Sequence, residues 1–381
     1  MDKVRFGVIG TGGMGSGHLR VMKELEEVAV TAVCDIDPEV CARVSAEQEV
    51  PGFVEAEALM DSGLVDAVIV ATPHYFHPPI SVAAMKKGLH VLSEKPVSVT
   101  VAAADEMNRV ARETGVKFVV MYQTRSTPRY VAMKKLVDEG RLGKLYRTCC
   151  INAWFRTQAY YDSAGWRATW KGEGGGVLIN QAPHGIDVFT SLAGLPCRVT
   201  AHTGTRRHRI EVEDEVSAML EYENGAVGFY HTSVTEAPGS DSLELCGEHG
   251  KLVVRGDAMT FSALDTPIQE FSDSSDEMWG SPAAREEEVA LEERESGHGA
   301  IIRNMARAIL FEEPLISPGV EGIRTVEFIN AVLLSGAKGK PVDLPVDRDE
   351  YEDFIELMKR TSRGKTLVGA ARRVTDPQFG A

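Results

Sequence analysis

Three glycines close to the N-terminus have the spacing of a phosphate-binding turn. Gly10, Gly12 and Gly15 follow the apolar run Val4–Ile9 and open a stretch with helical periodicity. The first glycine of such a turn permits a tight bend, the second lets backbone approach a pyrophosphate, and the third lets helix pack on strand. Unpaired amides at the helix N-terminus then meet the phosphate charge. The spacing predicts a dinucleotide site formed by Gly10, Gly12, Gly13, Met14 and Gly15.

Asp35 indicates which dinucleotide binds. It ends the second apolar run, Val28–Cys34, about 20 residues after the glycine turn, where a carboxylate can bond ribose hydroxyls. Such a carboxylate favours NAD and repels the 2′-phosphate of NADP. The following residues, Ile36, Asp37 and Pro38, bring no positive charge to offset that repulsion. We therefore predict NAD as the cofactor, with Asp35 and Ile36 among its contacts.

Lys95 is a candidate for chemistry on a substrate. It stands in Glu94-Lys95-Pro96, directly after the apolar run His90–Ser93. The carboxyl ends of parallel strands form the ligand-binding edge of a doubly wound sheet. A lysine there can hold an alcohol oxygen and stabilise the alkoxide charge that develops during oxidation. Taken alone, a lysine at a strand end is more often a surface charge.

Asn180, His184 and Asp187 supply an amide, an imidazole and a carboxylate at spacings i, i+4 and i+7. On a continuous helix they share one face. Pro183 offers a second possibility, a helix that begins only there, with Asn180 in a preceding turn. A histidine with an ordinary pKa of about 6.5 can accept an alcohol proton at neutral pH. The roles of His184 and Lys95 in moving that proton could also be exchanged.

Alternating elements in residues 1–122 predict the sheet that positions these groups. The apolar strand-like runs are Val4–Ile9, Val28–Cys34, Ala67–Ala71, His90–Ser93 and Lys117–Met121. The helix-like segments between them are Met14–Glu26, Ala56–Asp61, Ile80–Lys87 and Val101–Thr114. This alternation is typical of a doubly wound parallel sheet, so we expect a Rossmann domain over residues 1–122.

Residues 123–381 show consecutive strand candidates with few helices between them. The strand candidates are Lys144–Arg156, Arg198–Thr205, Glu215–Glu223, Ala226–Thr235, Ser242–Cys246, Lys251–Arg255 and Met259–Leu264. Asn224-Gly225 predicts a tight hairpin. We expect an open, mainly antiparallel sheet with helices on one face and a second subunit against the other. The helical segments are Leu178–Leu192, Ile301–Phe311 and Ile323–Ser335. The acidic stretch 271–299 is expected to be a surface loop that could act as an active-site flap.

Size and charge exclude several classes of protein. The chain has 381 residues and a net charge of −15, so two domains are expected, and nucleic acid or an anionic membrane is disfavoured as a partner. No apolar run is long enough to span a bilayer, and the first residues lack the pattern of a secretory signal. The six cysteines form no CxxC pair and no zinc spacing with histidine. We expect reduced thiols, no metal and a cytoplasmic location.

Together these motifs resemble the glucose–fructose oxidoreductase/inositol dehydrogenase/MocA family over essentially the whole chain. The resemblance is carried by the glycine loop with His18, Thr72-Pro73 with His77, Glu94-Lys95-Pro96, Gly174–Gly176 with Asn180, His184 and Asp187, and Val342–Pro345. It implies a Rossmann domain followed by an open antiparallel sheet, with Lys95 beside the nicotinamide and His184 as the proton-transfer residue. Many members have aspartate where this chain has Asn180, so we assign Asn180 to substrate binding through its amide.

The resemblance also implies a lining for the cofactor, with Arg125 near its nicotinamide end. We place in this lining Thr72, Pro73, His74, His77, Glu94, Lys95, Gln123, Trp166 and Arg167.

An aromatic and basic cluster suggests the kind of substrate. Three of the four tryptophans lie between positions 154 and 170. Aromatic faces can stack on pyranose rings while arginine and asparagine bond hydroxyls. We expect a pyranoside, an anhydrosugar or a nucleotide sugar, bound by Asn180, Asp187, Trp154, Arg156 and Tyr160. At least one tryptophan should instead pack between the domains, and Arg206–Arg209 should pair with the acidic residues that follow it.

The predicted function is oxidation of a secondary sugar hydroxyl by an NAD-dependent homo-oligomer. A non-catalytic NAD-binding regulator of the same fold would need the glycine loop but neither Lys95 nor His184. An NAD-dependent glycosidase would oxidise its substrate only transiently and release no net NADH. A reductase of a non-sugar compound would not need the hydroxyl-binding cluster.

Overall fold

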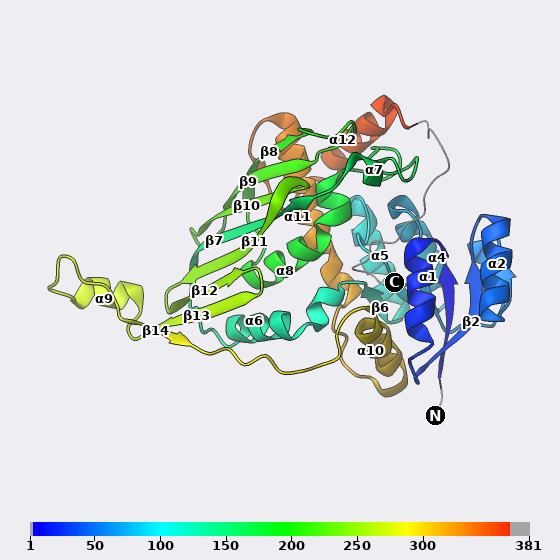
Figure 1. The fold of residues 1–381 in the computed structure, drawn as a ribbon, viewed down its shortest axis with the longest axis horizontal. Helices are drawn as coiled ribbons and strands as arrows, with labels where there is room; N and C mark the ends of the chain where they lie inside the picture. Colours follow the sequence, from blue (N-terminus) through cyan, green and yellow to red (C-terminus); the bar gives the residue numbers. More distant parts are fainter. Residues whose placement is uncertain (1–2, 366–381) are drawn as a thin grey trace.

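The computed structural model describes residues 3–365, which form two sheets with helices packed on them (Figure 1). The first sheet has the strand order β3-β2-β1-β4-β5-β6, and every pair is parallel. Its strands are β1 (Val4–Ile9), β2 (Val28–Cys34), β3 (Gly52–Phe53), β4 (Ala67–Val70), β5 (His90–Ser93) and β6 (Phe118–Val120). Its helices are α1 (Gly13–Met22), α2 (Pro38–Gln48), α3 (Ala56–Met60), α4 (His77–Lys86) and α5 (Val101–Thr114). The predicted Rossmann fold is confirmed.

Helices α2 and α12 (Arg348–Thr361) are among those absent from the sequence prediction. The start of α2 carries a capping signal, because Asp37 accepts hydrogen bonds from the amides of Glu39 and Val40 at 3.0 and 3.4 Å. Pro38 occupies the first turn. Few side chains of either helix are buried, and α2 in addition has weak apolar periodicity.

The second sheet has nine strands in the order β14-β13-β12-β11-β7-β10-β9-β8-β15. Its pairs are antiparallel except β7 with β10, which agrees with the predicted, mainly antiparallel sheet. The strands are β7 (Leu145–Phe155), β8 (Arg198–Gly204), β9 (Glu215–Glu221), β10 (Val227–Ser233), β11 (Thr235–Gly247), β12 (Gly250–Arg255), β13 (Ala258–Leu264), β14 (Ala284–Glu287) and β15 (Val342–Asp343). Asn224-Gly225 joins β9 to β10 with φ +85° at Gly225, as the hairpin prediction requires.

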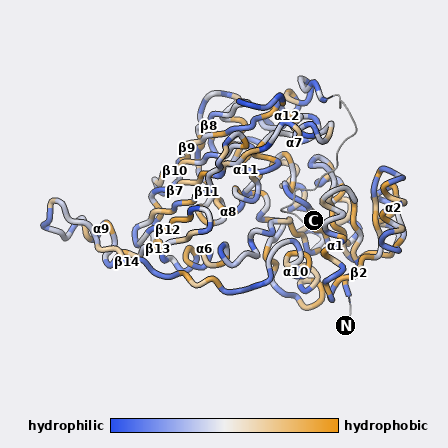
Figure 2. The backbone as a smooth tube through the Cα atoms, in the orientation of Figure 1, coloured by the Kyte–Doolittle hydropathy of each residue, from blue (hydrophilic) through white to orange (hydrophobic). Residues whose placement is uncertain are grey.

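Helices α6 (Pro128–Asp138), α8 (Pro183–Ala193) and α11 (Gly322–Lys338) cover one face of this sheet. Phe189 of α8 and Phe328 of α11 contact Tyr230 of β10, with ring centroids 5.8 and 5.1 Å apart. Figure 2 shows hydrophobic stretches running through these strands and helices. The core between this sheet and its helices fixes the start of α8, where His184 lies.

Helix α10 (His298–Phe311), expected on the same face, lies instead against the first sheet. Its buried Ile301 and Met305 share a hydrophobic cluster with Val8 of β1 and Leu19 of α1. An amphipathic pattern specifies an apolar face but not the sheet that covers it. The chain reaches this position by crossing back from β14 to α10 (Figure 1).

The acidic stretch 271–299 is not one continuous surface loop, and its part up to residue 287 lies away from the glycine loop (Figure 1). Helix α9 (Ile268–Ser274) and strand β14 interrupt it, and α9 has no buried residue. This part projects from the sheet edge, at the end of the molecule farthest from α1 and α2 (Figure 1). The loop between α9 and β14 carries Trp279, which is 93% exposed.

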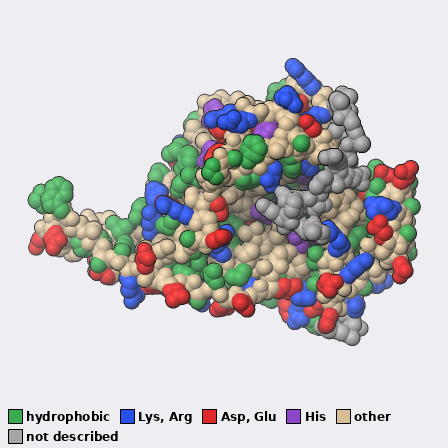
Figure 3. All heavy atoms as spheres, viewed as in Figure 1, with side chains coloured by type: hydrophobic (Ala, Val, Ile, Leu, Met, Phe, Trp, Pro, Cys, Tyr) green, Lys and Arg blue, Asp and Glu red, His purple; other side chains and the backbone are tan. Residues whose placement is uncertain are grey.

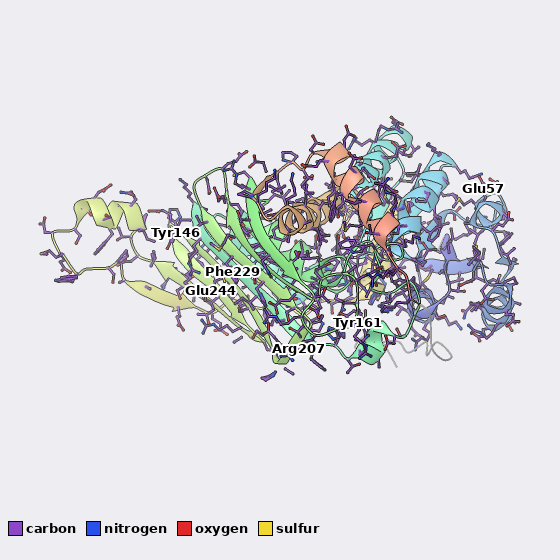
Figure 4. The ribbon with its side chains drawn as sticks, turned by 90° about the horizontal axis from the view of Figure 1, so that it is seen from above. Glu57, Tyr146, Tyr161, Arg207, Phe229 and Glu244 are labelled. Atoms are coloured by element: carbon purple, nitrogen blue, oxygen red, sulfur yellow. The ribbon has the colours of Figure 1, made fainter. Side chains whose placement is uncertain are left out.

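The outer face of the second sheet carries exposed apolar side chains. Met219 of β9 and Val227 of β10 are 56% and 50% exposed. Phe229 of β10 lies directly opposite Met219 in the pairing of the two strands (Figure 4). This face stays our predicted site for a second subunit. Within residues 3–365, no helix combines the length and apolar character needed to cross a membrane.

Candidate active site

The glycine loop has the geometry that its spacing predicts. Gly10 adopts φ +87°, and a Cβ added there would lie 2.7 Å from the oxygen of Ala71. A Cβ added at Gly15 would lie 1.9 Å from the oxygen of Gly10. At Gly12 it would meet no atom within 4 Å, so this position borders open space. Helix α1 begins at Gly13 without a side-chain cap, which leaves amides for an anion. The loop therefore fits a dinucleotide pyrophosphate.

Asp35 faces this loop from the end of β2. One carboxylate oxygen accepts from the amide and hydroxyl of Thr11 at 2.9 and 3.1 Å, and the other accepts from the amide of Asp37 at 3.1 Å. Neighbouring Ile36 is 89% exposed. The structure thus holds a carboxylate where ribose hydroxyls are expected, beside an apolar side chain that could cover an adenine ring.

Two buried histidines hold the loops that follow β4 and β5. His77 Nε2 lies 2.7 Å from the oxygen of Thr72, and its Nδ1 lies 2.7 Å from the oxygen of Pro96. His74 Nδ1 lies 3.0 Å from the oxygen of Glu173. Both rings therefore join backbone segments around the site, and their direct contact with a cofactor stays a prediction.

Glu94 forms a buried pair with His18 of α1. Its Oε1 lies 2.6 Å from His18 Nε2, and both side chains are almost inaccessible. Burial alone would raise the pKa of Glu94, but the hydrogen bond from His18 and nearby positive charges lower it to about 2. The ring of His298, on α10, packs edge-on against His18 at 5.3 Å between centroids. Glu94 is thus a charged, fixed neighbour of Lys95.

Lys95 reaches from the first sheet to the turn that precedes α8. Its Nζ donates a hydrogen bond to the main-chain oxygen of Asn180 at 2.6 Å. Asn180 lies in a π-helical turn, η3 (Val177–Gln181), and α8 begins at Pro183. The second of the two arrangements open from the sequence is therefore the correct one. Burial lowers the pKa of Lys95, although the charge of Glu94 opposes this effect.

His184 lies on the first turn of α8 with unused hydrogen-bonding capacity. Its Nε2 is 3.4 Å from Gln123 Nε2, and its buried Nδ1 has no partner within the described chain. Burial, reinforced by the charge of Lys95, lowers the pKa of His184 to about 3. Burial therefore favours the neutral imidazole at physiological pH.

Unpaired polar atoms concentrate at this site. Eleven buried side-chain nitrogen or oxygen atoms lack a partner within residues 3–365, and four of them belong to predicted site residues. These four are Thr72 Oγ1, Gln123 Oε1, Arg167 Nε and His184 Nδ1. Buried polar atoms are nearly always paired, so such a group indicates a ligand site. Figure 3 shows a hollow between the two halves of the molecule in which histidine side chains gather.

Tyr160 and Arg167 extend the site toward the aromatic cluster. Arg167 Nη1 donates to the Tyr160 hydroxyl at 2.5 Å, and the guanidinium lies 4.4 Å from the Tyr160 ring and 4.9 Å from the Trp166 ring. Asn180 Nδ2 donates to the same hydroxyl at 3.2 Å. Arg156 lies 5.7 Å from the Tyr160 ring. These residues form one connected cluster beside Lys95.

Other residues of this region have hydrogen-bond partners inside the protein. Trp154 Nε1 donates to Gln181 at 3.2 Å, next to η3. Trp170 packs edge-on against Phe354 of α12 and donates to the main-chain oxygen of Glu211. Both partners belong to the second part of the chain, so these contacts do not test the expected packing between the domains. Asp214 accepts hydrogen bonds from three main-chain amides of Arg206–Arg209 and contacts the ring of His208, which confirms local pairing.

Asp187 lies in a buried ion pair. Its two oxygens accept from Arg125 Nε and Nη2 at 2.7 and 2.6 Å, and Arg125 Nη1 also contacts Glu321 at 2.6 Å. The Asp187 side chain is only 1% exposed. The helical spacing predicted that Asp187 lies close to His184. The residue that binds Asp187, however, is Arg125, which follows β6 and is far away in the chain. Its contacts are those of a residue that supports the site, where sequence reasoning expected it to bind substrate.

We expect Asp187→Asn to destabilise the protein more than it weakens substrate binding. Removing one charge of a buried pair leaves Arg125 uncompensated and costs about 3–5 kcal/mol. Urea unfolding measures this loss. The matched control is Asp343→Asn, in an exposed pair with Arg198, which should leave the free energy of unfolding close to that of wild type. Normal stability with a raised KM would show instead that Asp187 binds substrate.

Glu173 joins the site although the sequence analysis did not select it. It is 1% exposed, and its Oε1 accepts a hydrogen bond from Asn180 Nδ2. The one feature of the sequence that could have indicated Glu173 is its position directly before Gly174–Gly176, in a segment already assigned to the site.

Comparison with known proteins identifies the family. Residues 4–122 match an oxidoreductase family with an NAD-binding Rossmann fold, and residues 130–253 match the GFO/IDH/MocA C-terminal domain. The chain belongs to the GFO/IDH/MocA oxidoreductase family. The predicted resemblance is confirmed, and the chain is an NAD-binding oxidoreductase.

Relatives span several activities. The 2,7-anhydro-N-acetylneuraminate hydratase of Mediterraneibacter gnavus is 31% identical over 58% of this chain and 58% of that protein. Inositol 2-dehydrogenase 2 of Saccharopolyspora erythraea is 31% identical over 65% of this chain and 72% of that protein. The WlbA dehydrogenase from Bordetella pertussis, solved with NADH and UDP-GlcNAcA, has a TM-score of 0.76 at 27% identity, covering 91% of this chain and all of that one.

Proposed function

We propose that this protein is an NAD-dependent dehydrogenase that oxidises a secondary hydroxyl of a sugar or sugar derivative. The observation that carries the proposal is the contact of Lys95 with the turn before α8. That contact brings a lysine, Asn180 and His184 together at the carboxyl edge of the Rossmann sheet. Bound NAD supplies the acceptor for the hydride.

Lys95 and His184 handle the oxygen and proton of the alcohol. The ammonium of Lys95 donates a hydrogen bond to the oxygen and stabilises negative charge as it develops. The neutral imidazole of His184 has a buried nitrogen without a partner, which suits it to accept a hydrogen bond from the hydroxyl. The carbon loses a hydride to NAD, the hydroxyl proton passes to Nδ1 of His184, and a carbonyl remains, while Lys95 keeps its own proton.

The substrate class follows from the cluster around Tyr160. It presents an aromatic ring beside two guanidinium groups and the side chain of Asn180. The names of the relatives, an inositol dehydrogenase and a dehydrogenase solved with a nucleotide sugar, favour a polyhydroxylated ring. We assign Trp154, Arg156, Tyr160 and Asn180 to binding of that ring.

The direct test is to mix the protein with NAD and a panel of sugars and follow nicotinamide absorbance. The panel comprises levoglucosan, myo-inositol and UDP-GlcNAcA. Net NADH formation with a panel member supports the proposal. Because one relative is named a hydratase, the products are also analysed for substrate conversion without net NADH. That outcome would replace net dehydrogenation with transient oxidation, and bound NAD without either reaction would favour a regulator.

We expect Asp35→Ser to weaken NADH binding by about 10- to 100-fold, since hydrogen bonds to a charged group contribute about 1.5–3 kcal/mol. The variant also removes the charge that repels the 2′-phosphate, so the ratio of NADPH to NADH affinity should rise. Fluorescence titration of both cofactors measures the two dissociation constants. Asp37→Ser is the matched control, because it removes a neighbouring carboxylate while serine can still cap α2. An unchanged affinity ratio in Asp35→Ser would show that Asp35 does not contact the ribose.

A further inference from the structure

Glu173 is a buried carboxyl group that the chemistry proposed above does not use. It lies between the aromatic segment and the glycine run Gly174–Gly176, and it is 1% exposed. Its Oε2 accepts from the amide of Ala168 at 2.5 Å, and its Oε1 accepts from Asn180 Nδ2. Arg167 Nη1 lies 3.8 Å from Oε1. Each carboxylate oxygen therefore has its own donor.

Asn180 connects Glu173 to Lys95. The side-chain amide of Asn180 donates to Glu173, while its main-chain oxygen accepts from Lys95 Nζ at 2.6 Å. The same amide also donates to the Tyr160 hydroxyl at 3.2 Å. Movement of Glu173 would consequently move the acceptor that holds the lysine and a side chain assigned to the substrate.

The backbone around Glu173 is closely confined. Ala168, which donates to Glu173, adopts φ +53°, a conformation that alanine rarely adopts. Gly174 follows at φ +83°, and a Cβ added at Gly176 would lie 1.8 Å from the oxygen of Glu213. Glu173 therefore bonds both a strained segment before it and the turn after it.

Several charged or titratable groups face Glu173. They are Arg167 of its own loop, Lys95 after β5, Lys365 after α12, Tyr160 and Tyr161 of α7 (Gln158–Tyr161), His74 after β4 and Glu213 before β9. Burial raises the pKa of Glu173 to about 7, although Arg167 and Lys95 oppose the rise. The charge of Glu173 in turn raises the pKa of Lys95.

We propose that Glu173 is a positioning residue that holds Asn180 and, through it, the ammonium of Lys95 at the reacting oxygen. The role requires the ionised form, because two donors, Ala168 N and Asn180 Nδ2, each need an acceptor oxygen. Glutamine offers one acceptor and one donor, so it leaves one of these contacts facing another N–H. The proposal rests on the function assigned to Lys95 above, and it extends that function to a residue that touches neither substrate nor cofactor.

The test compares wild type with Glu173→Gln, Glu173→Asp and Glu327→Gln. Glu327 is a buried carboxyl that bonds Val346 and Arg348, so its glutamine variant controls for removing a buried charge elsewhere. The first readout needs no substrate. Acetic anhydride labels amines in their neutral form, and mass spectrometry of the peptide containing Lys95 gives the pKa of that lysine from the labelling rate at several pH values.

In Glu173→Gln the pKa of Lys95 should fall, so that the lysine is labelled several-fold faster at neutral pH. Glu173→Asp keeps the charge and should retain more of the wild-type value, and Glu327→Gln should match wild type. An unchanged labelling curve in Glu173→Gln would overturn the link to Lys95.

The second readout is kcat for a panel sugar that yields NADH. Glu173→Gln should lower kcat about 10- to 100-fold through misplacement of reacting groups, with partial recovery in Glu173→Asp. Wild-type kcat should fall as the pH drops below about 7, where Glu173 gains a proton, and this limb should be absent in Glu173→Gln. An equal loss in Glu327→Gln, or a normal kcat in Glu173→Gln, would overturn the proposal. If no sugar yields NADH while labelling of Lys95 still responds to Glu173→Gln, then the proposed reaction fails and the positioning contact stands.

Discussion

Lys95→Met is expected to lower kcat by about 1,000-fold while NADH binds within a few-fold of wild type. Methionine has nearly the length of lysine but donates no hydrogen bond, so the alkoxide that develops during oxidation loses its charged partner. The contact between Lys95 Nζ and the oxygen of Asn180 is also lost, which frees the turn before α8. The glycine loop and Asp35 are unchanged by this substitution, and therefore the cofactor should still bind.

The measurement has two parts, kcat from the absorbance of NADH and the dissociation constant of NADH from fluorescence. Lys87→Met is the control, because Lys87 lies on the surface. Within residues 3–365 its ammonium pairs only with Asp61. It should leave both values near those of wild type. A kcat of Lys95→Met within tenfold of wild type would remove Lys95 from the chemistry.

His184→Leu is expected to lower kcat by about 100-fold or more, the usual contribution of a positioned proton acceptor. Leucine fills similar space but cannot accept the hydroxyl proton. The only hydrogen-bond contact that the ring makes within the described chain is the long one to Gln123, at 3.4 Å. Stability should therefore fall little, and thermal unfolding alongside kcat separates loss of chemistry from loss of fold.

The pH profile supplies a second criterion for His184. Because its pKa lies at about 3, wild-type His184 stays neutral throughout the working range, and any acid limb near pH 7 must arise from another group. His202→Ala is the control, since that ring is exposed on β8. An unchanged kcat in His184→Leu would show that His184 does not accept the hydroxyl proton and would leave that role to Lys95.

Local signals in the sequence were sufficient for the shape of the glycine loop. Gly10 adopts the positive φ of a tight turn and Gly15 packs closely against Gly10, as predicted, while the approach of Gly12 to a pyrophosphate stays a prediction. Local signals were also sufficient for the hairpin at Asn224-Gly225. Asp37-Pro38 was an equally local signal for the start of α2, but α2 was not predicted because its apolar periodicity is weak.

The features of the site that the sequence did not predict depend on tertiary contacts. Asp187 shares a helix face with His184, yet its partner Arg125 comes from the loop after β6, which no helix pattern reveals. The pKa of His184 depends on burial and on Lys95, which is far away in the chain. Glu173 acquires its importance only because the glycine run folds it against Asn180. The first two features depend on the docking of the two sheets, whereas Glu173 and Asn180 lie in one segment and meet through the fold of the glycine run.

The central claim is that a sugar carbon gives its hydride to NAD at the site of Lys95 and His184. The most direct measurement uses panel sugars deuterated at their ring carbons, with mass spectrometry of the nicotinamide cofactor after reaction. The account predicts reduced cofactor carrying one deuterium at the nicotinamide ring with wild type, and a loss of that product with Lys95→Met and with His184→Leu. Reduced cofactor without deuterium, or equal deuterium transfer in either variant, would contradict the account.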